Sequence, residues 1–183
     1  MLVVYGMINQ AVKDLVCHQA GEDTWLEVCR EAGVDPEGFE ALTPYPDSLT
    51  FKLVEIAAKK LNHAPDQLLR SFGRHWVFYT GEHGYGEVMR MFGKDFRSCL
   101  ANLNRMHAHM GALMPQLRPP RFVVRESSAT SMTVDYFSER QGLGPIVLGL
   151  LEGLAEKYHE TIAVEFLPKK APAGHDSFVV SFP

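Results

Sequence analysis

The sequence predicts an α+β protein in which a helical N-terminal part is followed by a ββαββ part with an antiparallel sheet. As far as Pro115, apolar residues recur about three to four positions apart, which is the spacing of one helix face. The segments 121–140, 161–167 and 175–182 are instead rich in β-branched and aromatic residues, which is typical of strands. Helices first and strands later is an order of elements found in α+β proteins.

Local signals place the individual elements. Gly33 suits a left-handed helix C-terminus, Pro65 a first helical turn and Pro115 a helix end. The segment "TPYPDS" (43–48) predicts a turn, and "GEHGYG" (81–86) predicts a break between helices. We expect helices at 5–17, 21–33, 48–62, 64–80 and 93–115, then a hairpin turning at 127–130, a helix at 143–159 and two strands joined at 168–174.

Composition restricts the partners and the compartment. A chain of 183 residues is long enough for one domain with its own core. The net charge of −4 disfavours nucleic-acid binding. Three scattered cysteines favour a reducing compartment and offer no zinc spacing. The N-terminus lacks a basic leader pattern, and the longest aliphatic run, 145–151, is too short to cross a bilayer. We therefore expect a cytoplasmic protein with no membrane insertion and no nucleic-acid partner.

One histidine interrupts an apolar helix face. His107 takes a position in the stripe of the 93–115 helix where a leucine is expected, whereas His109 is rotated by about 200° to the polar side. A neutral imidazole in an apolar wall is what axial ligation of haem iron requires. Two alternatives remain: a buried, hydrogen-bonded histidine, and zinc binding by His107 with His109. The stripe consists of Phe96, Leu100, Leu103, His107, Met110 and Met114.

A polar triplet follows in the hairpin. Tyr136, Ser138 and Arg140 recur at every second position of "YFSER", so on a strand they would share one face. A phenol, a hydroxyl and a guanidinium would bind a carboxylate through charge-assisted hydrogen bonds. Such a clamp fits haem propionates or another anionic ligand. The alternative is a strand face that is simply exposed to solvent.

Together with this triplet, His107 gives the chain a resemblance to the H-NOX family, the haem domains that bind nitric oxide or oxygen, one of which belongs to soluble guanylate cyclase. The similar stretches cover nearly the full length and read "YGMINQAVKDLV", "FGRHWVFYT", "NLNRMHAHMGALMPQLRPPRF", "DYFSERQGL" and "GHDSFVV". The resemblance implies a single haem domain over 1–183. Its helical subdomain would cover about 1–65 and its haem-holding part about 66–183, with the haem between them.

The resemblance also implies roles for individual residues. His107 matches the proximal ligand of the iron of haem b. The matches to the propionate-binding triad are Tyr136, Ser138 and Arg140. Pro120 matches a proline that presses on the haem face and helps to distort it. A rigid ring without an N–H suits that contact, although the pair of prolines at 119–120 is equally suited to a stiff connector.

The distal residues decide which gas is bound. Family members that hold oxygen use a distal tyrosine as a hydrogen-bond donor, and the matching position here is Ile146, which has no donor. Trp76 matches another distal position and could offer its indole N–H, although a tryptophan at helical spacing is more often part of a core. The resemblance therefore implies a nitric oxide sensor, with carbon monoxide as a second candidate gas.

The family pattern further implies how the signal is sent. Nitric oxide would bind a five-coordinate ferrous haem and weaken the iron–His107 bond, and the helical part would then shift relative to the sheet. No catalytic signature occurs in the 183 residues, so we expect no enzyme but a bacterial sensor that contacts a histidine kinase or a cyclic-dinucleotide enzyme. The alternatives are a peroxidase-like haem enzyme, which would use Arg74 and His75, and a non-haem module that binds an anionic ligand.

Overall fold

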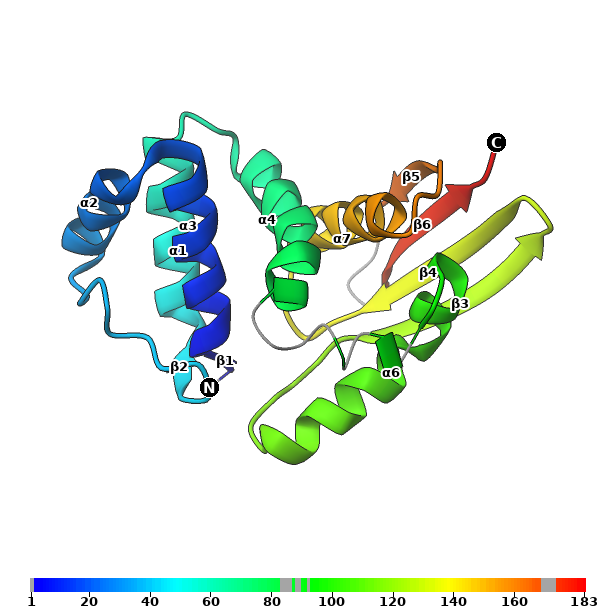
Figure 1. Cartoon of the computed structure of the whole chain (residues 1–183), viewed down its shortest axis with the longest axis horizontal. Coiled ribbons are helices and arrows are strands. Elements are labelled where there is room, and N and C mark those ends of the chain that lie inside the picture. The colour runs from blue at the N-terminus through cyan, green and yellow to red at the C-terminus, as the bar shows by residue number, and fades with distance from the viewer. Residues whose placement is uncertain (1, 83–86, 88–89, 92, 169–173) are drawn as a thin grey trace.

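The computed structural model describes residues 2–82, 87, 90–91, 93–168 and 174–183, and it has the predicted α+β class (Figure 1). Most of the predicted break at 81–86 and of the connection at 168–174 lies outside the described residues. The helical part contains β1 (Val3–Tyr5), α1 (Gly6–Ala20), α2 (Glu22–Ala32), β2 (Pro44–Pro46), α3 (Asp47–Lys60) and α4 (Pro65–Thr80). It is followed by α6 (Phe96–Leu113), β3 (Arg121–Ser128), β4 (Ser131–Phe137), α7 (Gly144–Lys157), β5 (Ala163–Leu167) and β6 (Asp176–Ser181).

The first three helices form a bundle with a core of its own, at the left of Figure 1. Trp25 of α2 is buried at the centre of this core, and its indole N–H donates to the carbonyl of Pro36 at 3.2 Å. Gly33 ends α2 in the left-handed conformation with φ 75°, and Pro65 is the first residue of α4. Both local predictions are confirmed.

A small two-stranded sheet closes one end of this bundle, and the sequence did not predict it. Val3–Tyr5 pairs antiparallel with Pro44–Pro46, so the prediction of a turn at 43–48 was wrong at these positions. Proline cannot donate to a sheet ladder and is tolerated only at strand edges. Both strands of a two-stranded sheet are edge strands, and this allows two prolines within three residues.

The larger sheet has the strand order β3-β4-β6-β5, and every neighbouring pair is antiparallel. Alternate residues of β4, namely Met132, Val134 and Tyr136, are buried in a second core together with Phe178 and Val180 of β6. Side chains of β4 alternate between the two faces because successive Cβ atoms of a strand point in opposite directions. The predicted ββαββ order is confirmed.

Helices α4 and α7 join the two halves of the molecule, and glycines allow them to pack closely. A Cβ atom added to Gly149 of α7 would lie 1.9 Å from the carbonyl oxygen of Arg70, and one added to Gly73 of α4 would lie 2.0 Å from that of Ile146. These distances mean that α4 and α7 touch backbone to backbone, near the middle of Figure 1. On the surface, Arg70 Nε donates to Glu152 at 2.9 Å across the same pair of helices.

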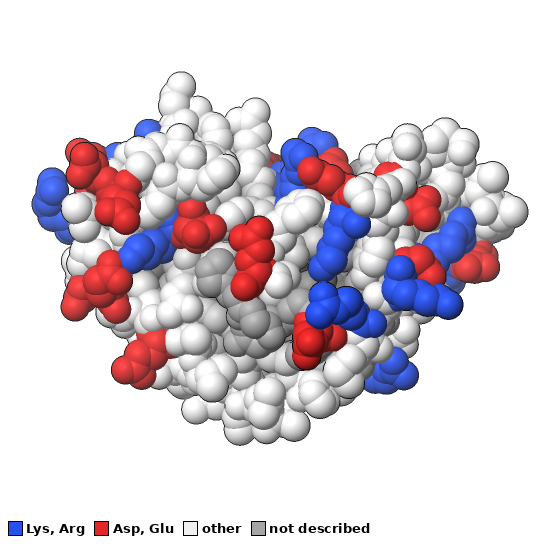
Figure 2. All heavy atoms as spheres, viewed as in Figure 1, with Lys and Arg blue, Asp and Glu red and all other residues white. Residues whose placement is uncertain are grey.

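Charged side chains of both signs are scattered over the face drawn in Figure 2, and no patch of one sign dominates it. The lower edge of that face, where α6 lies, carries few of them, because Arg97 and Arg105 are the charged residues of this helix. Among the described residues, no helix is both long enough and apolar enough to cross a membrane.

Candidate functional site

A cavity of about 360 Å³ lies between the helical part and the sheet part. Volumes of about 300–1,000 Å³ are usual for small-molecule and cofactor pockets. Its walls come from α1, α3, α4, α6, α7 and β4 and are mostly aliphatic and aromatic. Representative wall residues are Ile8, Val12, Phe51, Val54, Phe72, Trp76, Leu103, His107, Met110, Val134, Ile146 and Leu150.

His107 stands on the α6 wall of this cavity. The helix begins cleanly, because the carboxylate of Asp95 accepts from the backbone N–H of Ser98 at 2.7 Å and caps its N-terminus. The 4-3-4-3-4 stripe then carries the imidazole to the cavity side, whereas His109 is exposed on the opposite side. Neither these two histidines nor any other described residues form a cluster of metal ligands, so the zinc alternative gains no support.

The environment of His107 keeps its ring neutral. Burial lowers the pKa of the imidazole, and the backbone of Pro120 opposes this shift in part. The buried Nδ1 atom has no hydrogen bond of normal geometry among the described residues. The ring is half-buried and faces the cavity. A neutral imidazole keeps a nitrogen lone pair that is able to coordinate a metal.

Strand β4 ends at Phe137, so the prediction that Tyr136, Ser138 and Arg140 share one strand face was wrong. The chain bends after β4, and the backbone N–H of Arg140 donates to the Ser138 hydroxyl at 3.0 Å. The bend still brings the three side chains together, because all three line a second pocket of about 280 Å³ next to the cavity. Tyr136 and Arg140 line both spaces.

Tyr136 remains a hydrogen-bond donor in this position. Its side chain is buried on β4, and burial raises the pKa of the phenol, while a hydrogen bond with Ser138 opposes the shift. The phenol therefore keeps its proton at neutral pH. It can donate that proton to a carboxylate placed where the cavity meets the second pocket.

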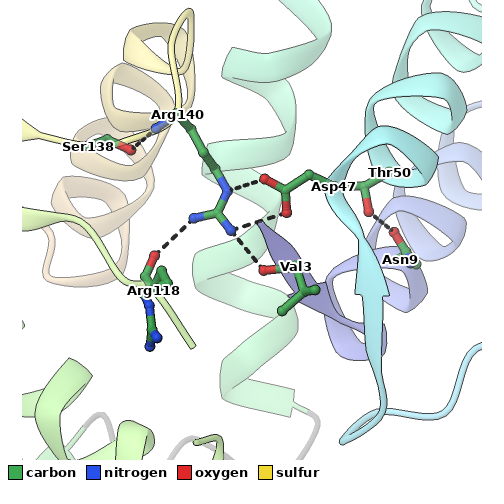
Figure 3. A network of polar contacts seen from close by, with 7 residues as sticks. All are labelled: Val3, Asn9, Asp47, Thr50, Arg118, Ser138 and Arg140. Carbon is green, nitrogen blue, oxygen red and sulfur yellow. Dashed lines mark hydrogen bonds and ion pairs between the residues drawn. The ribbon is translucent and has the colours of Figure 1, made fainter. Parts of the chain in front are cut away.

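Arg140 does not offer its whole guanidinium to a ligand. Figure 3 shows that its Nε and one terminal nitrogen contact the Asp47 carboxylate, at 2.8 and 3.2 Å. The same terminal nitrogen donates to the Val3 carbonyl, and the other donates to the Arg118 carbonyl. Arginine has five N–H groups, so the contacts among the described residues leave one of them for a ligand.

No pattern in the sequence indicated these partners of Arg140. Asp47 lies 93 residues before Arg140 in the chain, and its side chain is mostly buried beside the guanidinium. An acidic residue in the first turn of a helix has a local explanation, because it favours the positive end of the helix dipole. Only the three-dimensional structure shows that the α3 carboxylate also fixes the bend after β4.

Three other predicted residues line the cavity. Trp76 projects from α4, where its ring stacks on those of Phe72 and Tyr79, and Ile146 lies near the start of α7. Pro120 lies in the segment between α6 and β3 and is also part of the wall. The structure thus brings together six of the seven predicted residues around one cavity, with Ser138 in the pocket beside it.

The two residues of the peroxidase alternative point elsewhere. Arg74 donates to the carboxylate of Glu156 on α7 at 2.8 Å and is exposed. His75 lies 2.9 Å from the carboxylate of Asp14 on α1. Neither side chain lines the cavity, so this arrangement does not supply the distal acid–base group that peroxide chemistry needs.

Fold and site together define a ligand-binding protein with an apolar cavity, a neutral imidazole on its wall and carboxylate-binding donors at its rim. These features fit haem, which has an apolar ring, a metal and two acidic side chains. The chain belongs to the Haem-NO-binding family, whose sequence pattern matches residues 5–166. The predicted resemblance is confirmed, and the family is one of haem domains from gas-sensing proteins.

Curated relatives include soluble guanylate cyclases of animals. The chain is 26% identical to soluble guanylate cyclase gcy-31 of Caenorhabditis elegans over 165 residues, which are 90% of this chain and 24% of the relative. It is 22% identical to soluble guanylate cyclase 89Db of Drosophila melanogaster, over 85% of this chain and 23% of the relative. The chain therefore spans about a quarter of the length of these relatives.

Solved structures share the fold. A variant with three substitutions of an H-NOX protein from S. oneidensis, in the Fe(II) state, superimposes with a TM-score of 0.89 at 20% identity, covering 98% of this chain and 96% of the other. An H-NOX protein from S. oneidensis in the Fe(II)NO state gives a TM-score of 0.86 over 98% and 99% of the two chains. An oxygen-binding H-NOX domain gives 0.83 at 19% identity, over 98% and 95%.

Proposed function

We propose that this domain senses nitric oxide through a ferrous haem b that His107 holds in the cavity, and that it signals to a separate protein by a change of conformation. The observation that carries the proposal is the neutral His107 imidazole on the α6 wall of an apolar cavity. Bound there, haem would supply the iron that takes the gas. Every other contribution comes from side chains of this domain.

The acidic side chains of the haem would lie at the rim. Burial of a carboxylate costs several kcal/mol unless charge-assisted hydrogen bonds replace its water. We assign this task to the Tyr136 phenol, the Ser138 hydroxyl and the one N–H of Arg140 that its contacts with protein leave available. Pro120, on the cavity wall near His107, would press against the ring.

The distal wall favours nitric oxide over oxygen. Bound oxygen is polarised and gains from a hydrogen-bond donor, and Ile146 offers none. The two threonine hydroxyls of the cavity are already used as donors: Thr50 donates to Asn9 at 2.7 Å, and Thr80 donates to the Trp76 carbonyl at 2.8 Å. Trp76 lines the cavity with a ring that stacks on Phe72 and Tyr79, so we assign it a packing role beside the gas and not that of a donor. Carbon monoxide, which also needs no donor, is a second candidate.

The signal would begin at α6. His107 would hold the metal, so release of His107 on gas binding would free α6 from a tether and would let the helical part move relative to the sheet. A receiver must distinguish the two arrangements for this motion to act as a switch. We propose a histidine kinase or a cyclic-dinucleotide enzyme as the receiver. Co-purification from the native cell tests this, and a failure to retain any signalling protein would count against it.

Absorption spectroscopy tests the haem assignment. The His107→Ala variant should take up no stable haem, and added imidazole should restore uptake by replacing the missing ligand. His109→Ala, which removes the exposed imidazole on the other side of α6, is the matched control and should load normally. Normal loading of His107→Ala without imidazole would refute the assignment.

The gas assignment needs a second spectrum. The reduced protein should shift its Soret band with nitric oxide and carbon monoxide and should show no stable oxygen complex. Replacing Ile146 with Tyr should add a donor and favour oxygen binding. A stable oxygen complex in the unaltered protein would overturn the proposed selectivity.

A further inference from the structure

The first strand, β1, touches both the exit of the ligand helix α6 and the residue at the haem rim. The phenol oxygen of Tyr5, at the end of β1, accepts a hydrogen bond from the backbone N–H of Gln116 at 3.2 Å. Two residues earlier, the Val3 carbonyl accepts from Arg140 at 2.8 Å. These contacts join residues 111 and 137 positions apart in the chain. A three-residue strand thus connects two separate parts of the candidate site.

The Tyr5 side of this contact is buried and packed. Tyr5 is 5% exposed and forms a small apolar cluster with Met7 of α1 and with Met114, the residue that ends α6. Met110 and Trp76 pack against this cluster from opposite walls of the cavity. The phenol therefore lies where the ligand helix, the distal helix α4 and the N-terminal strand meet.

The ligand helix α6 is joined to the sheet by Asn104, whose side-chain amide exchanges hydrogen bonds of 2.6 and 2.9 Å with the backbone of Phe122 on β3. Of its 18 residues, Phe96, Cys99 and Leu100 are buried, and all three lie in its first turns. Its C-terminal half lines the cavity or faces solvent until Met114. Beyond His107, the Tyr5–Met114–Gln116 contact joins the end of α6 to the helical part of the molecule.

We propose that the hydrogen bond from the Gln116 N–H to the Tyr5 hydroxyl transmits motion of α6 to the helical part of the molecule. We call this contact the latch. The inference rests on the proposed function, because α6 must first move when His107 is released. With the latch closed, a shift of the end of α6 pulls β1. Since β1 pairs with β2 and leads directly into α1, the shift reaches the N-terminal bundle. Without the hydroxyl, α6 moves alone.

Tyr5→Phe tests the latch with little change in packing, because the ring stays buried and only the acceptor is lost. Tyr45→Phe is the matched control. Its hydroxyl accepts from the Glu40 N–H and donates to the Gly38 carbonyl, so both of its hydrogen bonds stay within the helical part. In the haem-free protein, the Gln116 amide of Tyr5→Phe should exchange about fivefold faster than in the wild type, because one hydrogen bond is lost. An unchanged rate would show that the contact does not exist in solution.

The decisive measurement is hydrogen exchange of the haem-loaded, reduced protein with and without nitric oxide. In the wild type, peptides from the end of α6 and from β1 should both change their exchange. In Tyr5→Phe the α6 change should persist with unaltered gas binding, whereas the β1 change should fall by roughly threefold or more. Tyr45→Phe should respond like the wild type at both places.

Each other outcome overturns the latch. An undiminished β1 response in Tyr5→Phe means that another route carries the motion. An equal loss in Tyr45→Phe means that the helical part has merely loosened, and a lost α6 response in Tyr5→Phe means that the phenol acts on gas binding itself. If wild-type α6 does not respond to nitric oxide at all, the proposed function fails, and the latch fails with it.

Discussion

Helices α6 and α7 both border the cavity from the sheet side, but the protein holds them in different ways. Half of the residues of α7 are buried, and its glycines let it touch the backbone of α4. In α6, burial is limited to Phe96, Cys99 and Leu100, and much of its inner face lines the cavity. The fold therefore fixes the position of α7, whereas the position of α6 depends on what fills the cavity. A sensor needs both kinds of helix: one as a fixed reference and one that its ligand can move.

The largest expected effect is a loss of stability when the close contact between α4 and α7 is disrupted. Gly149→Ala places a Cβ where a carbonyl oxygen lies 1.9 Å away, so the helices must separate. We expect a loss of about 3 kcal/mol in the free energy of unfolding, measured by urea denaturation. Gly111→Ala on α6 is the matched control, because its Cβ meets no atom within 4 Å. It should be neutral or stabilise by up to about 1 kcal/mol. Equal losses of stability in the two variants would show that α7 is not held more tightly than α6.

The second-largest expected difference between α6 and α7 is in the rate of amide exchange after haem is removed. Without the ring, the inner face of α6 loses its packing partner, while α7 keeps its contact with α4. We expect amides in the second half of α6 to exchange about a hundredfold faster in the haem-free protein, and those of α7 to change by less than about tenfold. Mass spectrometry of peptides from the two helices gives both rates. Uniform acceleration would show that haem stabilises the whole domain rather than α6.

The next largest loss of stability should follow a substitution at the bend that leads into α7. Asp47→Ala leaves the guanidinium of Arg140, which is 13% exposed, without its carboxylate. We expect a loss of about 2 kcal/mol, because an unpaired charge remains in a mostly buried position. Glu55→Ala breaks an exposed ion pair on the same helix, α3, and should cost nothing measurable. Urea denaturation of both variants measures the difference.

The smallest expected effect is the contribution of His107 to the pH dependence of stability. Burial lowers the pKa of His107 below the value of about 6.5 that it has in the unfolded chain. The unfolded chain thus binds more protons between these two values, so the haem-free protein should lose stability as the pH falls from about 6.5 through the lower folded value. His107→Leu should lose less over this range. Urea denaturation at pH 7.5 and 5.5 tests this, and an unchanged pH dependence would show that another group is responsible.

Local sequence signals predicted most of the fold, because the information lies in spacing. The helical stripe around His107 and the alternation in β4 place their side chains correctly without knowledge of any partner. The β1–β2 pair was missed, because three-residue strands are too short for a period and the two prolines suggest a turn. The tight contact between α4 and α7 was missed because a single glycine has the same appearance in a sequence whatever approaches it.

The candidate site was predictable as a set of residue types but not as a geometry. The imidazole, the phenol and the guanidinium were found, yet the phenol and the guanidinium were placed with Ser138 on one face of a strand that ends at Phe137. The division of the Arg140 donors among Asp47, Val3 and Arg118 joins segments that are distant in the chain. No window of sequence contains such a contact, so only the folded chain shows how little of Arg140 remains for a ligand.

The cavity has a consequence for behaviour under hydrostatic pressure. Unfolding removes internal voids, and the system volume then falls, so pressure favours the unfolded chain in proportion to the void that disappears. Because a space of about 360 Å³ with apolar walls is filled only when the cofactor is bound, the cofactor-free domain should unfold at lower pressure than the loaded one. Compression to a few kilobar, followed by intrinsic tryptophan fluorescence, would therefore separate the two forms without any chemical denaturant.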